Sequence, residues 1–363
     1  MPELYPNPVA PRVIAVADAG NAAERHYADY FARLKDLTDG AEIYVLMDGD
    51  LDRDGGLPAK DKYARARALR SAGAACVVEM PLSAQSLVDN LYAFAVRAML
   101  HKLGGIDALA IPCAGDRETF TRTAAFLFNE PAPYQRRMRA LRDEGEDLEA
   151  VFPAVVGEFV DGAGEFLARR QNRMAVEYAN ILKRTYSTVK PFWLEYEEPA
   201  CGKSEAAVRR DAFALSRAAE EFLRGPEKEA LARAEDMFSG SPRMARRIYD
   251  LLEAHPEGGL KAFSFAAACA DMNPAAVRRY LMSCLVGYRK LDSFVCITYS
   301  YIPYIRVLDV APEALARVRE TAGTTLIVDT PEAQDFSQVT DDYKQLLLKM
   351  DARARTLFVE SEG

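Results

Sequence analysis

The sequence predicts an α/β fold with a parallel, doubly wound sheet, followed by a mostly helical C-terminal domain. Four short apolar runs lie within the first 112 residues, and they alternate with segments of helical periodicity. Strands that alternate with helices at this rhythm are typical of a parallel sheet covered on both faces. From residue 204 onward nearly every pattern is helical.

The first strand and helix are expected within residues 13–40. Residues 13–17 (VIAVA) form an apolar run, and residues 18–21 have the composition of a turn at its end. From residue 22 apolar side chains recur every three or four positions, and Gly40 ends this helical pattern. The predicted turn therefore connects the first strand to the first helix.

Residues 47–81 are the most informative part of the chain. Residues 41–47 have the pattern of a buried strand that opens into a loop at 48–58. A basic helical pattern follows at 59–72, and residues 74–79 predict the next strand. This order is a βαβ unit, and open α/β sheets bind ligands at the carboxyl ends of their strands. The loop is therefore expected to lie at the ligand-binding edge.

The rest of the chain is predicted to add two strands and a series of helices. Strands are expected at 106–112 and 189–194, and helices at 83–103, 119–128, 133–144, 204–224 and 228–238; residues 151–183 are expected to be mostly helical with glycine interruptions. The Ser-Gly-Ser-Pro segment at 239–242 predicts a boundary. We therefore expect an α/β domain with helical insertions at 1–238 and a helical C-terminal domain at 239–363.

Composition argues against several kinds of site and partner. The 363-residue chain has a formal net charge of −8, which disfavours a protein that coats DNA or RNA non-specifically. Arginine clusters at 136–142, 243–247 and 278–279 are expected to be solvated helix faces. No apolar run is long enough to predict a membrane span. Six cysteines without CxxC spacing and three histidines disfavour a metal site and indicate reduced thiols in a cytoplasmic protein.

These elements carry six segments that resemble, in order, the tRNA(Met) cytidine acetate ligase family of HIGH-type nucleotidyltransferases. The segments are MDGD…PAKDKYARA at 47–66, CVVEMP at 76–81, LARRQNRMAVEYANILKR at 167–184, VKPFW at 189–193, SEAAVR at 204–209 and IPYIRVL at 302–308. The resemblance implies that the α/β domain is a Rossmann-like nucleotidyltransferase domain.

The activity that this resemblance implies is that of an ATP-dependent ligase. Such enzymes join acetate to AMP, release pyrophosphate, and pass the acetyl group to a cytidine of elongator tRNA(Met). ATP is the implied cofactor, and Mg²⁺ is implied only through ATP. Positive or hydrogen-bonding groups are needed around the phosphates because negative charge builds on them during the reaction.

In the family, a loop after the first strand supplies two histidines, a glycine turn and a helix N-terminus for the phosphates. At the matching positions of this chain, the residues predicted to bind nucleotide are Asp18, Gly20, Arg25 and His26. His26 matches the second histidine and is the predicted catalytic residue, whereas Ala23 takes the place of the first. Arg25 replaces the motif glycine; its side chain would either block close backbone approach or bind phosphate through its charge.

Three more residues are predicted to bind nucleotide from their match to the family. Asn172 stands where the family has the second asparagine of a Pro-Asn-Asn segment, and Ser204 with Arg209 retains the ends of a phosphate-binding loop. Asn172 and Ser204 fit equally well as a turn residue and a helix N-cap. Tyr196 lies where the family has an arginine shortly after its Lys-Pro strand.

The acceptor is less well defined by the sequence. Residues 270–276 carry no positive charge, although the family is basic there and such charge would suit an RNA backbone. Three hypotheses stay open: an active ligase acting on tRNA, an adenylyltransferase with another acceptor, and a pseudoenzyme that keeps the fold to bind a nucleotide or a protein.

Overall fold

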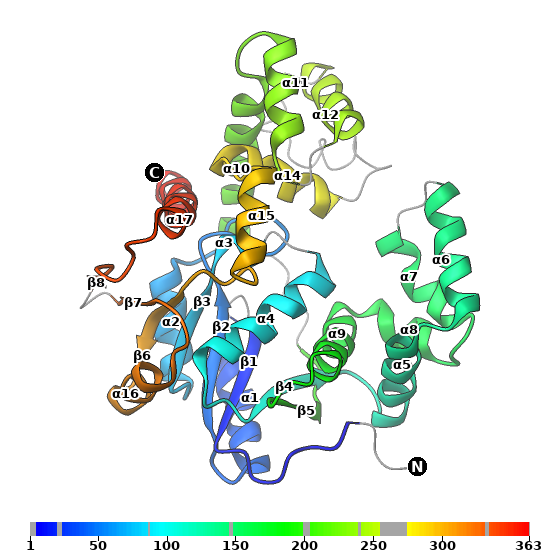
Figure 1. Ribbon diagram of the computed structural model, residues 1–363, viewed down its shortest axis with the longest axis vertical. Helices are drawn as coiled ribbons and strands as arrows, with labels where there is room; N and C mark the ends of the chain where they lie inside the picture. Colours follow the sequence, from blue (N-terminus) through cyan, green and yellow to red (C-terminus); the bar gives the residue numbers. More distant parts are fainter. Residues whose placement is uncertain are drawn as a thin grey trace.

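The computed structural model describes residues 5–19, 24–85, 88–144, 148–198, 204–238, 241–254, 274–330 and 334–362. Its centre is an eight-stranded sheet with the order β5-β4-β1-β2-β3-β6-β7-β8, surrounded by helices (Figure 1). The α/β class predicted from the sequence is therefore confirmed.

The first five strands are parallel and lie where the sequence predicts them. They are β1 (Val13–Ala19), β2 (Glu42–Asp48), β3 (Cys76–Met80), β4 (Ala108–Cys113) and β5 (Lys190–Glu195). β1 pairs with β2 on one side and with β4 on the other, so the chain crosses back over β1 after β3. Such a switch point opens a crevice at the carboxyl ends of β1 and β4, where doubly wound sheets bind ligands.

The C-terminal part of the chain is mostly helical, as predicted, but it also contributes three strands that the sequence analysis did not foresee. β6 (Ile305–Val310) is antiparallel to β3, β7 (Leu326–Asp329) is parallel to β6, and β8 (Gln334–Asp335) closes that edge. The β6 segment escaped detection because Arg306 interrupts its apolar run, although that side chain is buried. The division at 238/239 stays a prediction, and the sheet takes strands from both sides of it.

Most predicted helices are present with small changes at their ends. The helices of the first part are α1 (Glu24–Leu37), α2 (Lys62–Ser71), α3 (Leu82–Gln85), α4 (Asp89–Leu103), α5 (Arg117–Asn129), α6 (Ala132–Glu144), α7 (Leu148–Gly157), α8 (Ala163–Ala168), α9 (Arg170–Arg184), α10 (Glu205–Leu223) and α11 (Glu227–Asp236). The expected helix at 59–72 begins later because the Asp61 carboxylate accepts hydrogen bonds from the backbone N–H groups of Tyr63 and Ala64. The segment expected as one helix at 83–103 contains α3 and α4.

The helices after residue 238 form most of the C-terminal part. They are α12 (Pro242–Ala254), α14 (Pro274–Val286), α15 (Lys290–Thr298), α16 (Pro312–Thr321) and α17 (Asp342–Glu360). In Figure 1, α10, α11, α12 and α14 gather at one end of the molecule.

Alternating side chains of the sheet belong to two different cores. In β1, Val13 and Ala15 join the core under α4 and α9, whereas Ile14 and Val16 join the core under α1 and α2. This period of two places helices on both faces. A third core joins α10, α12, α14 and α17, and it includes Leu51 and Leu57 from the loop after β2. The loop after β2 therefore packs against the helices of this third core.

The loop after β2 is fastened directly to α10 and α14. The backbone N–H of Leu57 donates to Asp211 Oδ1 of α10 at 2.8 Å. Gly55 has a φ of +73°, and a Cβ there would lie 2.9 Å from the backbone of Arg278 and Arg279 in α14. Such an approach is open only to glycine.

Gly55→Ala should therefore lower the free energy of unfolding by more than backbone strain alone. Gly40→Ala is a matched control, because Gly40 has a φ of +85° and nothing within 4 Å of an added Cβ. We expect Gly40→Ala to cost about 1 kcal/mol and Gly55→Ala about 2–4 kcal/mol, from strain plus overpacking. Urea denaturation of both variants measures the difference. Equal losses would contradict the close packing of this loop on α14.

Candidate functional site

His26 lies in the first turns of α1, just beyond the carboxyl end of β1. Its ring Nδ1 is 2.5 Å from the hydroxyl oxygen of Tyr196, which follows the last residue of β5. This contact joins the residue that follows β5 to the start of α1, across the switch point between β1 and β4. No described residue hydrogen-bonds the other ring nitrogen, Nε2.

Aromatic rings surround His26 and fix its environment. Its ring is stacked on Tyr30 with 6.2 Å between centroids and 14° between planes, and it lies 5.2 Å from the ring of Tyr27. Burial lowers the pKa of His26, and the charge of Asp29 only partly offsets this effect. The imidazole is therefore neutral at physiological pH.

Asn172 holds the end of β4 from inside the protein. Its side-chain amide donates to the carbonyl oxygens of Ala114 and Phe166 at 2.9 and 2.8 Å, and its Oδ1 accepts from the N–H of Ala114 at 2.8 Å. The side chain has no exposed surface. Asn172 thus sets the backbone that follows β4, and any contribution to nucleotide binding would act through that backbone.

Ser204 and Arg209 lie at the start of α10. Ser204 is the N-cap, and its Oγ accepts a hydrogen bond from the N–H of Ala207 at 3.2 Å. Arg209 is exposed and pairs with Glu205 at 3.1 Å across one helical turn. These geometries match the alternative of a helix cap for Ser204, and the nucleotide-binding roles of both residues stay predictions.

The remaining predicted binding residues are only partly within the described structure. Asp18 lies in β1 and Arg25 in α1, but their side chains lie outside the described atoms. Gly20 lies outside the described residues. Their roles toward a nucleotide stay predictions.

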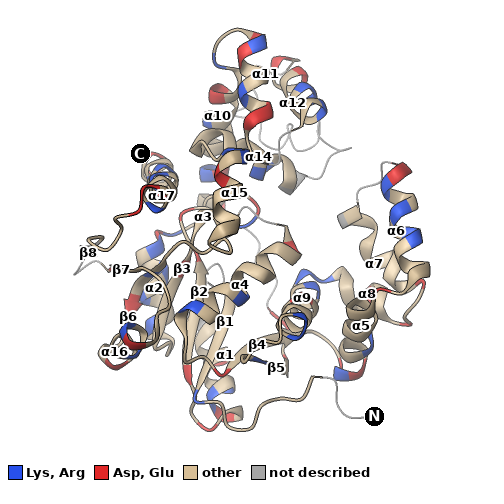
Figure 2. Ribbon diagram, viewed as in Figure 1, with Lys and Arg blue, Asp and Glu red and all other residues tan. Residues whose placement is uncertain are grey.

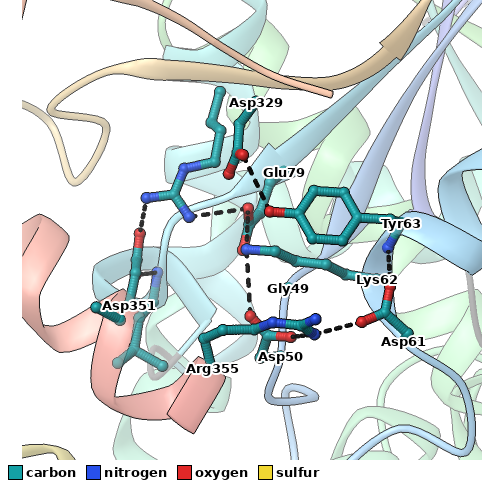
Figure 3. Close-up of polar contacts among 12 residues, drawn as sticks. Gly49, Asp50, Asp61, Lys62, Tyr63, Glu79, Asp329, Asp351 and Arg355 are labelled. Atoms are coloured by element: carbon teal, nitrogen blue, oxygen red, sulfur yellow. Dashed lines mark hydrogen bonds and ion pairs between the residues drawn. The ribbon is translucent and has the colours of Figure 1, made fainter. Parts of the chain in front are cut away.

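Beside this site, a network of buried charges fixes the carboxyl ends of β2 and β3. Lys62 Nζ lies 3.1 Å from Asp50 and 3.0 Å from Glu79, and Arg306 contacts the same Glu79 carboxylate at 3.0 Å. The network continues to α17 through Asp351 and Arg355. Figure 3 shows Arg355 reaching toward both Asp50 and Asp61.

The charges of the network compensate one another despite deep burial. Burial alone would raise the pKa of Glu79, but the charges of Lys62 and Arg306 outweigh it and hold that pKa below its usual value. For Lys62, burial would lower the pKa, but Glu79 and Asp50 outweigh it and raise that pKa. Lys62 and Glu79 are therefore both charged in the folded protein, and neither is replaceable alone.

The network also explains why glycine stands at position 49. A Cβ at Gly49 would lie 2.2 Å from Glu79 Oε1 and 3.2 Å from Gln85 Nε2. Arg65 donates to the carbonyl oxygens of Asp48 and Gly49, at 3.0 Å for Asp48. The start of the loop after β2 is thereby held by side chains of α2 and β3.

Glu177 on α9 is a half-buried carboxylate of a different kind. None of the described residues pairs with it or donates a hydrogen bond to it. Burial, with a further contribution from the charge of Asp89, raises its pKa to about 7, while Arg184 acts in the opposite direction. Its charge is therefore unfavourable in the folded state.

The predicted solvated arginine clusters differ in exposure, and the cluster on α6 is exposed as expected. All four arginines of α6 are exposed, and Figure 2 shows basic residues along this helix. Arg246 of α12 pairs with Glu227 and Asp250. Arg278 differs from the prediction, because it is half-buried and lies 3.6 Å from Asp211. In that cluster an arginine joins α14 to α10.

Within the described ranges, no group of three or more His, Cys, Asp or Glu side chains is arranged to hold a metal ion. None of the helices in the described part of the chain has both the length and the apolar character needed to cross a bilayer.

Comparison with known proteins identifies the type of fold around this site. A family model described as HIGH Nucleotidyl Transferase matches residues 30–210. The chain belongs to this family. The matched segment contains Asn172, Tyr196 and Ser204, and it begins just after His26.

Curated relatives of this HIGH nucleotidyl transferase are tRNA(Met) cytidine acetate ligases. That of Caldanaerobacter subterraneus subsp. tengcongensis is 26% identical over 164 residues, which cover 44% of this chain and 40% of the relative. That of Acetivibrio thermocellus is 25% identical over 161 residues, covering 43% and 39% of the two chains. The matches thus span about two fifths of the length of these relatives.

Two crystal structures of Thermotoga maritima TmcAL share the fold along nearly the whole chain. The form bound with alpha-thio ATP has a TM-score of 0.72 and covers 94% of this chain and 92% of its own. The apo form has a TM-score of 0.74 with the same coverage. Both are 16% identical to this chain, a level that establishes the fold alone. The fold similarity extends beyond the segment matched by the family model.

The structure brings together residues that sequence reasoning about the family missed. Tyr196 was noted as a departure from the family pattern, but its contact with His26 was not predicted. Tyr30 lies one helical turn after His26, and this spacing of four was the available signal. The contact with Tyr196 spans 170 positions in the sequence, so no local pattern could reveal it.

Lys62→Met should destabilise this nucleotidyl transferase by about 3–5 kcal/mol, because it removes a buried cation that both Asp50 and Glu79 contact and leaves each carboxylate with only one of its two cationic partners. Lys228→Met is a matched control, since Lys228 is exposed on α11; we expect a change within about 0.5 kcal/mol. Denaturant unfolding measures both. Adding Glu79→Gln to Lys62→Met should recover part of the loss, and a purely additive result would contradict direct coupling.

Glu177→Gln should stabilise the protein at high pH. The folded-state pKa of about 7 lies above the ordinary value of 4.5, so wild-type stability falls as pH rises from about 4.5 through 7. The variant should be more stable by roughly 1–2 kcal/mol at pH 8.5, after allowance for solvent screening, and nearly equal to wild type at pH 4.5. Thermal unfolding at both values, with Glu320→Gln on the exposed face of α16 as control, tests this expectation. A pH-independent difference would refute it.

Proposed function

We propose that this chain binds ATP at the carboxyl ends of β1 and β4 and uses it to activate a carboxylic acid as an acyl-adenylate. The observation that carries the proposal is the position of His26. It lies at the start of α1 beside the switch point of a HIGH nucleotidyl transferase fold. The N-terminus of a helix favours phosphate groups through its free N–H groups and its dipole.

In the proposed reaction, a carboxylate oxygen of the acid attacks the α-phosphorus of ATP. The bond to the bridging oxygen breaks, pyrophosphate leaves, and an acyl-adenylate forms. An amino group of the acceptor then attacks the acyl carbon and AMP leaves. The role of His26 is to donate a hydrogen bond from Nε2 to a phosphate oxygen, where negative charge increases during the first step. Mg²⁺ would enter with the phosphates of ATP.

Acetate and a tRNA cytidine are the acid and acceptor we propose first, because the curated relatives are tRNA(Met) cytidine acetate ligases. Another acceptor is the second candidate. It is favoured by residues 270–276, which carry no positive charge, although the resemblance to the ligase family implies a basic segment there. Acid-dependent exchange of labelled pyrophosphate into ATP, followed by transfer assays with tRNA, separates activation from acceptor choice. Nucleotide binding without exchange for any acid would leave a pseudoenzyme.

His26→Ala should weaken the binding of a non-hydrolysable ATP analogue with Mg²⁺ by roughly 10- to 100-fold, as expected for loss of a hydrogen bond to a charged group. His101→Ala is the matched control, because His101 is exposed near the end of α4. Calorimetric titration measures both affinities. Unchanged affinity in His26→Ala would overturn this placement of the nucleotide, and absence of binding by wild type up to millimolar ligand would overturn the proposed function.

A further inference from the structure

We propose that Tyr196 is a positioning residue that sets the tautomer of His26. Its phenolic O–H donates to Nδ1 of His26, so the imidazole proton resides on Nε2. The orientation and tautomer are properties of the free protein. The use of the Nε2 proton toward phosphate rests on the proposed function.

The two side chains are held in place by packing as well as by their hydrogen bond. The oxygen of Tyr196 lies 2.5 Å from Nδ1 of His26, and their ring centroids are 5.3 Å apart. Tyr30 contacts both rings: its centroid is 4.7 Å from that of Tyr196, and it stacks on His26. Tyr30 is itself buried, so the pair rests on a fixed surface of α1.

The protonation of both partners is compatible with the proposed direction of the hydrogen bond. Burial raises the pKa of Tyr196, with contributions in the same direction from Glu198 and Asp29, while Arg33 lowers it. The phenol therefore keeps its proton at neutral pH. Burial lowers the pKa of His26, so one ring nitrogen has a free lone pair. Donation from the phenol to Nδ1 leaves the ring proton on Nε2.

A neutral Nε2–H donor gives this site a different pH dependence from that of a cationic site. An imidazolium would lose its charge, and with it affinity for phosphate, as pH rises above about 6.5. A neutral donor keeps its proton throughout the range from about pH 7 to 9.

The test is nitrogen-15 NMR of the imidazole rings in the full chain, which has only three histidines. At pH 7.5 the His26 ring should be in the Nε2–H tautomer. In Tyr196→Phe, which keeps the aromatic ring, the pKa of His26 should rise by roughly half a unit to one unit because the neutral form loses a hydrogen bond. The tautomer preference should weaken at the same time. Tyr343→Phe, at an exposed tyrosine of α17, should change neither property.

An unchanged tautomer and pKa in Tyr196→Phe would overturn the proposal. A fall in the pKa of His26 would also overturn it, since that result requires Nδ1 to be the donor. These readouts do not depend on nucleotide binding.

A second measurement tests the link to nucleotide by titrating wild type and Tyr196→Phe with the ATP analogue and Mg²⁺ from pH 6 to 9. Wild-type affinity should be flat between about pH 7 and 9, and the variant should bind roughly 3- to 10-fold more weakly in that range. If wild type binds but its affinity follows imidazolium formation, the assignment of a neutral donor is wrong. If wild type binds no nucleotide, the proposed function fails while the NMR result still decides the role of Tyr196.

Discussion

The pairing of Lys62 with Glu79 is the interaction on which much of this structure depends. Both side chains are almost completely removed from water, and each would be strongly destabilising without the other. Lys62 begins α2, and Glu79 lies in β3, so their contact fixes the second half of the βαβ unit that contains the loop at 48–58. Arg306 joins the same carboxylate and places β6 beside β3. The antiparallel edge of the sheet is thus attached to its parallel centre by charge as well as by backbone hydrogen bonds.

The candidate site uses the opposite strategy. Around His26 the described side chains provide aromatic surface and one short hydrogen bond, and burial keeps the ring neutral, whereas the network beside β2 and β3 is built from ion pairs. A neutral donor makes a weaker hydrogen bond to phosphate than a cation does. Unlike a buried cation, however, it needs no carboxylate partner to compensate its charge.

The sequence predicts the parallel part of the fold well because its signal is local. Each of the first five strands is a short apolar run, and the turn residues and helical periods between them are visible without the structure. β6 was missed because a buried ion pair makes a core position look polar. The contact of His26 with Tyr196 was missed because it joins two elements through the fold. Asn172 was found from its match to the family, but its three hydrogen bonds to backbone show a supporting position behind the site.

The route of the chain through the sheet has a consequence for synthesis on the ribosome. Lys62, Glu79 and Asp50 are made early, but Arg306, Asp351 and Arg355, which complete their environment, are made near the end. A nascent chain therefore carries a half-completed set of charges that favours hydration over burial until α17 has emerged. The set of buried ion pairs at the carboxyl ends of β2 and β3 is therefore complete only once α17 has been synthesised.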